Sequence, residues 1–371
     1  MLPYFTRDFG NPSSSHEAGR AAAAAIAAAR SQVGALIGAG QDGEILFTSG
    51  ATEANNTALL QALGQGERNE IVVSAVEHPS ILSALPDLEK QHGLAVHRIG
   101  VDANGRLDMA SFERALNRHT ALVSIMWANN ETGSVFAVAA LAEMAHRAGA
   151  LFHSDAVQAA GKLAIDVKST AIDMLSLSAH KCHGPKGVGA LYLRKAVKFR
   201  ALLRGGRQER ARRAGTENVP AIVGFGKAAE LARLGLKQDM ARVVLLRDWL
   251  ERSVCGMIPE TFVLGDRSNR LPNISMLAFD GADGEEILHR LDRADVAASA
   301  GSACASGVMQ PSHVLRAMRV PYRAAQGAVR FSLSRETSEA DVNALLDVLP
   351  EIVLRARAAS PFAGRHAAAA E

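Results

Sequence analysis

The sequence predicts an α/β fold, in which a mostly parallel sheet is flanked by helices and is followed by a smaller α+β domain. Short β-rich runs alternate with helical stretches through the first half of the chain, and this alternation is typical of βαβ units. After about Gly226 it gives way to a long charged helix, which further strands and helices follow. We therefore expect a large ligand-binding domain, residues 1–238, and a small domain, residues 239–371.

The elements expected in the large domain follow one another in βαβ order. Six runs rich in apolar residues predict strands at 44–47, 71–73, 95–99, 121–126, 151–153 and 174–177. Helix-start signals precede two helical stretches: Ser14–Glu17 stands before an alanine run, and Thr52–Glu53 stands before residues 54–63. For the small domain, the pattern predicts a helix through Arg252 and strands at 262–264, 274–279 and 329–333.

The composition is that of a globular protein, since 48% of the 371 residues are apolar. The 41 basic and 38 acidic residues nearly balance, so the charge gives no reason to expect a nucleic acid or a membrane as a partner. The 3 cysteines, Cys182, Cys255 and Cys304, are widely spaced, which argues for a reducing compartment. The sequence contains neither a secretory signal nor an apolar run that could span a bilayer. We expect a cytoplasmic protein.

Lys181 stands in a polar, glycine-rich segment that runs from Ser178 to Gly187. An amine held among histidine, serine and glycine-bounded backbone could form a Schiff base with an aldehyde cofactor, provided that burial or a neighbouring cation favours its neutral form. The alternative is a solvated surface lysine, which this segment alone favours because most lysines are exposed. The adjacent Cys182 is expected to be a packing residue whose side chain points away from Lys181 if the segment is extended.

Asp155 follows an apolar strand, and Gln158 comes three residues later. A carboxylate and an amide so placed could address different edges of one flat heterocycle, and a pyridinium nitrogen needs such a carboxylate to stay protonated. The alternative for Asp155 is a helix N-cap, which would be favoured if Lys181 were absent. The presence of both Asp155 and Lys181 therefore favours a cofactor site more strongly than either residue does alone.

Two further strand-end segments carry polar residues that could meet a ligand. The turn Ser49–Glu53 opens a helix, so its backbone N–H groups and the Thr52 hydroxyl could hold a phosphate, although ordinary capping explains the turn equally well. His78 precedes a proline and could stack on a ring or transfer a proton, although a lone histidine in a loop is more often a hydrogen-bonded surface group. The basic segment 204–213 lacks aromatic residues for base stacking, which favours a phosphate-binding or subunit-contact loop.

Cys304 lies in a run of small residues, 299–307, with glycines near both ends. A thiol on such a loop can act as a nucleophile once it is deprotonated, whereas a structural cysteine more often sits among large apolar residues. Arg330 stands between Val329 and Phe331 in an expected strand, so it should project to the opposite face and could clamp a carboxylate. A structural salt bridge is the alternative for Arg330.

Taken together, these segments resemble the cysteine desulfurases of the pyridoxal-phosphate class V aminotransferase family, above all the nitrogenase-associated, NifS-like branch. The resemblance covers almost the whole chain, and its most specific motifs lie at 126–133, 155–159, 212–218 and 301–304. It implies fold type I of the enzymes that depend on pyridoxal 5′-phosphate (PLP). It also implies that the large domain binds PLP and that the small domain carries the loop of the catalytic cysteine.

The resemblance implies a role for each matching residue. Lys181 would hold the cofactor as a Schiff base, while His78 would stack on its ring. Asp155 would pair with the pyridinium nitrogen, and Gln158 would meet the ring hydroxyl. The phosphate would be bound by Ala51, Thr52, Ser178, His180 and, from the other subunit of a homodimer, Thr216. The carboxylate of the substrate, L-cysteine, would be held by Asn130 and Arg330.

The family reaction would then centre on Cys304. Its thiolate would attack the substrate sulfur, so that alanine leaves and Cys304 carries a persulfide for an iron–sulfur scaffold or another sulfur-acceptor protein. The product sulfur would serve iron–sulfur cluster assembly, including that of nitrogenase. We expect no resident metal, and Cys304 would meet iron only transiently during cluster transfer.

Two alternatives and one departure from the family pattern stay open at this point. The same chemistry on selenocysteine would make the chain a selenocysteine lyase, in which the thiol is less necessary. The chain begins at a point inside the usual family sequence, so we expect an N-terminal truncation. A truncated chain could instead be an inactive PLP-binding protein that docks with a sulfur scaffold.

Overall fold

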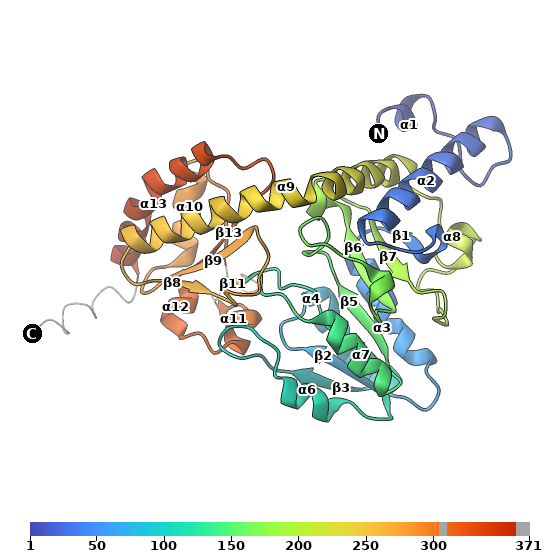
Figure 1. Cartoon of the computed structure of the whole chain (residues 1–371), viewed down its shortest axis with the longest axis horizontal. Helices are drawn as coiled ribbons and strands as arrows, with labels where there is room; N and C mark the ends of the chain where they lie inside the picture. The colour runs from blue at the N-terminus through green and yellow to red at the C-terminus, as the bar shows by residue number, and fades with distance from the viewer. Residues whose placement is uncertain (301, 304–309, 361–371) are drawn as a thin grey trace, which may run out of the picture. The chain divides into compact units, whose positions relative to one another are not determined.

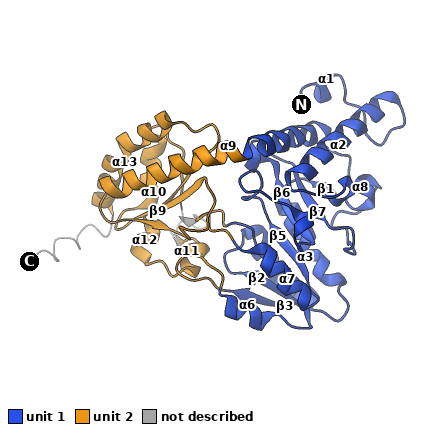
Figure 2. Ribbon diagram, in the orientation of Figure 1, with its two compact units in different colours: residues 1–99, 108–128, 136–236 blue, residues 100–107, 129–135, 237–371 orange. Residues whose placement is uncertain are grey.

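The computed structural model describes residues 1–300, 302–303 and 310–360. These residues form two compact units, which Figure 2 shows in different colours. Unit 1 comprises residues 1–99, 108–128 and 136–236, and unit 2 comprises 100–107, 129–135 and the described part of 237–371. Two short segments of the N-terminal half thus belong to unit 2, a grouping that the sequence does not predict. The functional division into residues 1–238 and 239–371 stays a prediction.

Unit 1 is built on a seven-stranded sheet of order β1-β7-β6-β5-β4-β2-β3 (Figure 1). Its strands are β1 (Ile45–Thr48), β2 (Glu70–Ser74), β3 (Ala95–Ile99), β4 (Thr120–Ser124), β5 (Leu151–Asp155), β6 (Met174–Ser178) and β7 (Gly189–Leu193). Strands β2 to β6 pair in parallel, whereas β7 is antiparallel to both of its neighbours, β1 and β6. The mostly parallel sheet and its six predicted strands are confirmed, but the sequence reasoning missed β7.

Helices and short turns connect these strands. They are α1 (Pro3–Thr6), α2 (Glu17–Leu36), η1 (Asp42–Glu44), α3 (Ala51–Leu60), η2 (Gln61–Gly64), α4 (Pro79–Leu82), α5 (Leu85–His92), α6 (Met109–Ala115), α7 (Val138–Arg147), η3 (Val167–Ser169), η4 (Ala179–Cys182) and α8 (Gln208–Ala211). Helix α3 packs on β6 and β7, and α7 packs on β4 and β5 (Figure 1). Because helices cover the sheet, strands such as β4 and β6 are buried along their whole length.

The predicted helix after Ser14 is confirmed, and it begins at Glu17. The side chain of His16 accepts a hydrogen bond from the Gly19 backbone and caps the first turn of α2. The helix predicted over 54–63 is also present, but α3 begins earlier, at Ala51, directly after Gly50. The turn that carries Thr52 is therefore the first turn of a helix.

Unit 2 contains a four-stranded antiparallel sheet of order β10-β13-β9-β8 and a separate pair, β11 and β12. Its elements are β8 (Thr261–Leu264), β9 (Ile274–Phe279), α10 (Gly284–Asp292), β10 (Ser299–Ala300), β11 (Ser302–Ala303), β12 (Gln310–Pro311), α11 (His313–Ala317), α12 (Tyr322–Gln326), β13 (Ala328–Ser332) and α13 (Glu339–Ala359). The long helix α9 (Val219–Met257) gives its first residues to unit 1 and its last to unit 2. Buried side chains of α9, α10, α13 and the sheet share one apolar core. The α+β character of this part is confirmed.

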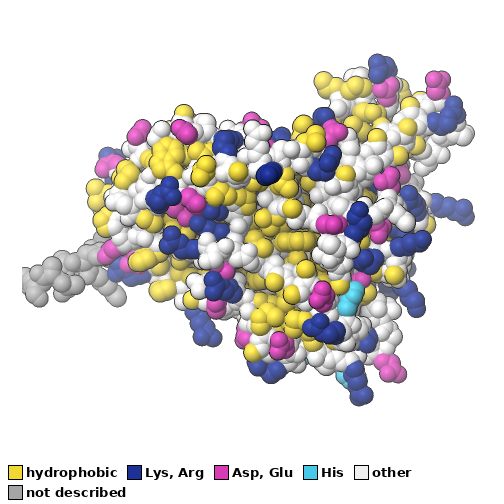
Figure 3. Space-filling view, in the orientation of Figure 1, with side chains coloured by type: hydrophobic (Ala, Val, Ile, Leu, Met, Phe, Trp, Pro, Cys, Tyr) yellow, Lys and Arg dark blue, Asp and Glu magenta, His cyan; other side chains and the backbone are white. Residues whose placement is uncertain are grey.

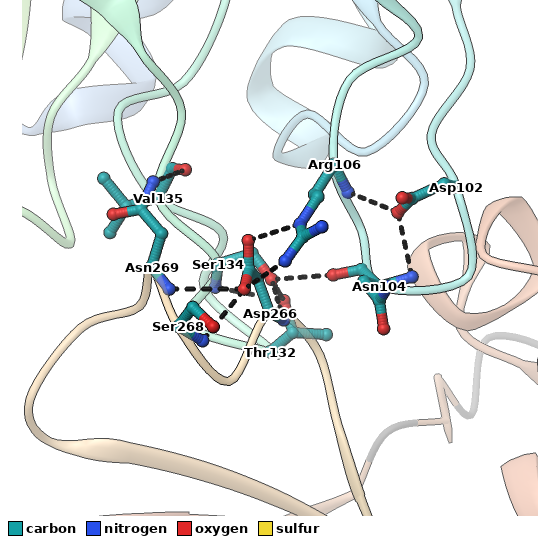
Figure 4. A network of polar contacts seen from close by, with 9 residues as sticks. All are labelled: Asp102, Asn104, Arg106, Thr132, Ser134, Val135, Asp266, Ser268 and Asn269. Atoms are coloured by element: carbon teal, nitrogen blue, oxygen red, sulfur yellow. Dashed lines mark hydrogen bonds and ion pairs between the residues drawn. The ribbon is translucent and has the colours of Figure 1, made fainter.

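A polar network fastens the two short N-terminal segments within unit 2 (Figure 4). The Arg106 guanidinium donates to both oxygens of Asp266, at 2.6 and 3.0 Å. The Ser134 hydroxyl donates to the Asn104 carbonyl at 3.3 Å and accepts from the Asp266 backbone at 3.0 Å. The Asn269 side chain donates to the Val135 carbonyl at 3.0 Å. These bonds hold the loop 129–135, which carries Asn130, against the loop that follows β8.

Every helix within residues 1–300 and 310–360 is too short or too polar to cross a membrane. On the face shown in Figure 3, basic and acidic side chains of the described residues are interspersed. The near balance of charge in the sequence is thus also visible on this part of the surface.

Candidate active site

The sheet of unit 1 gathers the predicted cofactor residues at one edge. Strands β1 and β6 are both antiparallel to β7, so they run in the same direction as each other and as β2 and β5. The carboxyl ends of these strands therefore lie on the same edge of the sheet. Thr52 follows β1, His78 follows β2, Asp155 ends β5, and the Lys181 turn follows β6.

Asp155 is a buried carboxylate with two hydrogen-bond donors. Its Oδ1 accepts from the Val157 backbone at 3.0 Å, and its Oδ2 accepts from the Asn55 amide nitrogen at 2.7 Å. Burial raises the pKa of Asp155 from its usual value, while the two hydrogen bonds oppose the rise. A buried carboxylate of this kind suits a cationic ring nitrogen, because such a partner would restore the charge balance lost on burial.

Lys181 lies in the one-turn 3₁₀ helix η4, directly after β6. The Lys162 ammonium donates to the Lys181 main-chain carbonyl at 3.0 Å and so ties the turn to the loop after β5. Burial, assisted by the positive charge of Lys181, lowers the pKa of Lys162 to about 8, while Cys182 opposes the shift. A second lysine thus lies next to the Lys181 turn, and a neighbouring cation favours the neutral form of a lysine amine.

The structure corrects the reason given for the role of Cys182. Cys182 is buried, as expected of a packing residue, and its thiol donates to the Ala179 carbonyl at 3.2 Å. The segment is a helical turn and not an extended strand, so strand alternation does not set the direction of this side chain. Whether Cys182 has a role in the reaction stays untested.

The start of α3 offers backbone N–H groups to an anion, as the sequence predicts. Glycine is required nearby, because a Cβ on Gly189 would lie 2.8 Å from the Gly50 backbone. The Glu53 carboxylate accepts from the Ser49 backbone at 2.8 Å and pairs with Arg213 at 3.0 Å. Burial raises the pKa of Glu53, but these two partners outweigh it and hold the pKa below its usual value. They fix the loop that leads into α3.

The residues predicted to bind the phosphate lie around this loop. Ala51 and Thr52 occupy the first turn of α3, and the Ser178 hydroxyl lies 3.0 Å from Nδ1 of His180. Burial, together with the lysines at 181, 186 and 162, lowers the pKa of His180 and keeps its ring neutral. Thr216 is exposed, and Gln158 is half-buried in the turn after β5.

His78 is the N-cap of the short helix α4. Its Nδ1 accepts from the Ser80 backbone at 3.1 Å and lies 2.8 Å from the Ser80 hydroxyl. The ring is thus hydrogen-bonded within its own loop, the alternative that the sequence left open. The same bonds orient the ring, so they do not argue against stacking on a cofactor.

Unit 2 brings the two predicted substrate residues together. Arg330 on β13 donates to the main-chain carbonyl of Asn130 at 2.7 Å and to the Ser299 hydroxyl at 3.1 Å. Burial lowers the pKa of Arg330, and the nearby carboxylate of Glu131 opposes this. The Asn129 side chain accepts from the Glu131 and Thr132 backbones at 2.9 and 3.0 Å, which folds the loop so that Asn130 stands in its turn. Val329 and Phe331 are buried, as the predicted alternation requires.

Cys304 lies outside the described residues. In the part of the chain that the structure does describe, no three His, Cys, Asp or Glu side chains gather into a metal site.

The sequence reasoning missed several polar residues that support this site. Asn55 bonds Asp155, and Ser80 bonds His78. Glu77 is fully buried beside His78, and it accepts from the Ser74 hydroxyl at 2.6 Å and from the Met126 backbone at 2.9 Å. His153 is buried on the sheet between the hydroxyls of Ser124 and Ser176, at 2.8 and 2.9 Å. Lys162 completes the group. In the sequence, such residues can be found as polar residues on an otherwise apolar helix face or strand.

Comparison with known proteins agrees with this geometry. Residues 1–345 match the aminotransferase class-V family. A cysteine desulfurase from Cereibacter sphaeroides is 60% identical over 363 residues, covering 98% of this chain and 93% of the relative. The cysteine desulfurase NifS of Azotobacter vinelandii is 50% identical over 363 residues, with 98% and 90% covered. The chain belongs to the cysteine desulfurases of the class-V aminotransferase family. A solved NifS-like protein superimposes with a TM-score of 0.89 at 33% identity, over 95% of this chain and 94% of the other.

This membership confirms PLP fold type I and PLP as the cofactor of the desulfurase. The residues of unit 1 fit that cofactor. The buried Asp155 carboxylate matches its pyridinium nitrogen, the Lys181 amine matches its aldehyde, and the start of α3 matches its phosphate. The comparisons do not favour a selenocysteine lyase or an inactive docking protein.

Proposed function

We propose that this chain removes sulfur from L-cysteine, yielding L-alanine and a persulfide on Cys304. The observation that carries the proposal is that Asp155 ends β5, and that the strand paired with β5, β6, leads directly into the turn that carries Lys181. When bound, PLP supplies an electron sink that weakens the bond between Cβ and sulfur in the substrate. Binding, orientation and sulfur transfer are the work of the chain's own side chains and backbone N–H groups.

The residues of unit 1 hold and orient the cofactor. The Lys181 amine would bind the aldehyde, and the Asp155 carboxylate would keep the ring nitrogen protonated. Gln158 would bind the ring hydroxyl, and His78 would stack on the ring. The phosphate is bound by Ala51, Thr52, Ser178, His180 and Thr216 of the other subunit. These roles are supported by the place of each residue at the carboxyl edge of the sheet and by its hydrogen-bond partners.

The residues of unit 2 bind the substrate and take the sulfur. Arg330 and Asn130 hold the carboxylate, because a guanidinium fork matches its two oxygens. The Cys304 thiolate attacks the substrate sulfur, so that a sulfur–sulfur bond forms as the carbon–sulfur bond breaks. The electron pair of the broken bond stays on carbon, which takes up a proton to become the methyl group of alanine.

Partners and location follow from the same proposal. The desulfurase acts as a homodimer, a state supported by the exposure of Thr216, which is assigned to the other subunit's phosphate site. A cytoplasmic location is supported by the three widely spaced cysteines, which are typical of a reducing compartment. Its persulfide passes to an iron–sulfur scaffold or another acceptor protein, for cluster assembly that includes the clusters of nitrogenase. The name NifS, carried by the relative in Azotobacter vinelandii, supports the nitrogenase assignment.

The proposal is tested by turnover of the purified protein loaded with PLP. With L-cysteine and a dithiol reductant, alanine and sulfide should appear in equal amounts. Cys304→Ala should keep the bound cofactor and lose sulfide release, whereas Cys255→Ala, which changes an exposed thiol, should behave as wild type. Full sulfide release by Cys304→Ala would overturn the persulfide step. Release of selenium but not sulfur by wild type would instead identify a selenocysteine lyase.

A further inference from the structure

We propose that Asn55 and Ser80 are positioning residues that join Asp155 to His78 in one directional chain of hydrogen bonds, so that the two cofactor-ring residues are set together. The proposal deepens the proposed function and rests on it for the roles of Asp155 and His78. The hydrogen-bonded chain itself lies wholly within unit 1. Asn55 and Ser80 come from different helices, α3 and α4, so the chain also ties these helices together.

The Asn55 amide is held in one orientation. Asn55 is fully buried, and its Nδ2 donates to Asp155 Oδ2 at 2.7 Å and to Ser80 Oγ at 2.8 Å. Both amide hydrogens are thus used. A rotated amide would turn its carbonyl oxygen toward the Asp155 carboxylate, and two acceptors would face each other. Among the described residues, Asn55 Oδ1 accepts no hydrogen bond. The side chain therefore serves as a double donor.

Ser80 carries the direction of the chain to His78. Its hydroxyl oxygen accepts from Asn55, so its hydroxyl hydrogen is available to His78 Nδ1, 2.8 Å away. The Ser80 backbone N–H donates to the same Nδ1 at 3.1 Å. A nitrogen that accepts two hydrogen bonds keeps its lone pair, so the His78 proton resides on Nε2 and the ring is neutral. Each donor in the series thus points away from Asn55.

Three titratable groups face this chain. Asp155 accepts at its inner end, and His78 accepts at its outer end. Glu77 precedes His78, and burial, reinforced by the charge of Asp155, raises the pKa of Glu77 to about 8. Burial also raises the pKa of Asp155, and the Asn55 donor opposes that rise. Removing the Asn55 amide would leave that carboxylate with one donor fewer in a buried place.

Two substitutions distinguish a connected chain of hydrogen bonds from independent roles of Asn55 and Ser80. Asn55→Leu keeps the approximate volume and removes both donors, whereas Ser80→Ala removes the hydroxyl and keeps the backbone N–H. Ser83→Ala is the matched control, because Ser83 is the C-cap of the same helix, α4, and is exposed. Ser80 is only half-buried, so Ser80→Ala should fold even if Asn55→Leu does not, and it can then be used alone for the test.

The first measurement is the nitrogen NMR spectrum of His78 in cofactor-free protein, with the resonances assigned from His78→Asn. Wild type should show an unprotonated Nδ1 and a protonated Nε2. Ser80→Ala should reduce the preference for this tautomer by roughly two- to tenfold. Asn55→Leu should change it in the same direction, although Asn55 does not touch His78. A His78 spectrum that Asn55→Leu leaves unchanged, or a protonated Nδ1 in wild type, would overturn the proposal.

The second measurement is the dissociation constant for PLP. Asn55→Leu should weaken binding by roughly 10–100-fold, because a buried carboxylate loses a donor. Ser80→Ala should weaken it less, and the double variant should fall short of the product of the single effects. Ser83→Ala should match wild type. Independent, multiplicative effects would contradict a connected chain. A wild type that binds no PLP would contradict the proposed function instead, and the His78 spectrum would still decide the inference.

Discussion

Arg330 on β13 donates to the main-chain carbonyl of Asn130 at 2.7 Å, which joins two residues 200 positions apart in the sequence. The bond fixes the guanidinium plane against the loop that carries the Asn130 side chain. A clamp for a carboxylate needs both its position and its plane defined, because a bidentate contact is directional. The two residues assigned to the substrate are therefore held together by a hydrogen bond, and a change in either should alter substrate binding.

Arg330→Lys should raise KM for L-cysteine far more than it lowers kcat. The charge is kept but the planar fork is lost, and one such contact is worth roughly 10–100-fold in affinity. Steady-state kinetics of alanine formation give both constants. Arg316→Lys, an exposed change in the same unit, should leave KM at the wild-type value. An unchanged KM in Arg330→Lys would remove Arg330 from the substrate site.

The Arg106–Asp266 pair should affect both the stability of the fold at low pH and the binding of the substrate (Figure 4). Arg106 lowers the pKa of Asp266 to about 2, against its burial. A depressed folded-state pKa stabilises the fold above the unfolded-state value, and the contribution is lost as the pH falls from about 4 to about 2. Arg106→Gln should therefore lower Tm at pH 7 and flatten its fall in this range.

The same substitution should also raise KM, because the network holds the loop of Asn130. Thermal unfolding from pH 2 to pH 7 and steady-state kinetics check the two parts separately. A lower Tm with unchanged KM would leave the pair a purely structural role.

Glu77→Gln should make the stability of the fold depend less on rising pH. Burial raises the pKa of Glu77 to about 8, so the folded state holds a proton that the unfolded state has released above its own, lower pKa. Stability from this group is present at low pH and is lost as the pH rises from about 4.5 to about 8. The glutamine variant has no proton to release. Its Tm should decline less than that of wild type across this range, and an equal decline would refute the neutral state of Glu77.

His153→Asn should reduce the loss of stability on the acid side, where falling pH destabilises the wild-type fold. Burial lowers the pKa of His153 to about 3, so the unfolded state binds a proton that the folded state does not. Stability is then lost as the pH falls from about 6.5 toward about 3, by up to about 4 kcal/mol. Urea unfolding at pH 7 and pH 5 should show a smaller difference for the variant. The flanking serines, Ser124 and Ser176, can bond an amide in place of the imidazole.

Much of the fold was predictable because its strands are apolar runs between clear turn signals. Strand β7 was not, because it opens with Gly189 and Ala190, residues with low strand propensity. Glycine is needed there, since a Cβ at 189 would lie 2.5 Å from the Leu177 carbonyl. The close approach of β7 to the Leu177 carbonyl and to the Gly50 backbone thus requires a glycine that weakens the strand pattern in the sequence.

The residues assigned to the cofactor were chosen from strand ends and motifs in the sequence, and their roles stay predictions. The polar residues that support them were not foreseen. Asn55 and Asn56 are adjacent in the sequence, yet the helix buries Asn55 against Asp155 and leaves Asn56 half-buried. Only the rotation of α3 against the sheet distinguishes them. Asn55 does lie on the same helix face as the buried Ala54 and Ala58, and a polar residue on such a face was the signal to follow.

We expect Lys181 to bind the aldehyde of PLP in this cysteine desulfurase. The decisive measurement is borohydride reduction of the yellow protein, followed by peptide mapping by mass. Reduction should remove the visible absorption band and leave a pyridoxyl group on the peptide that contains Lys181, with none on the neighbouring Lys162 or Lys186. Attachment at another lysine, or reduction without a modified peptide, would contradict this assignment.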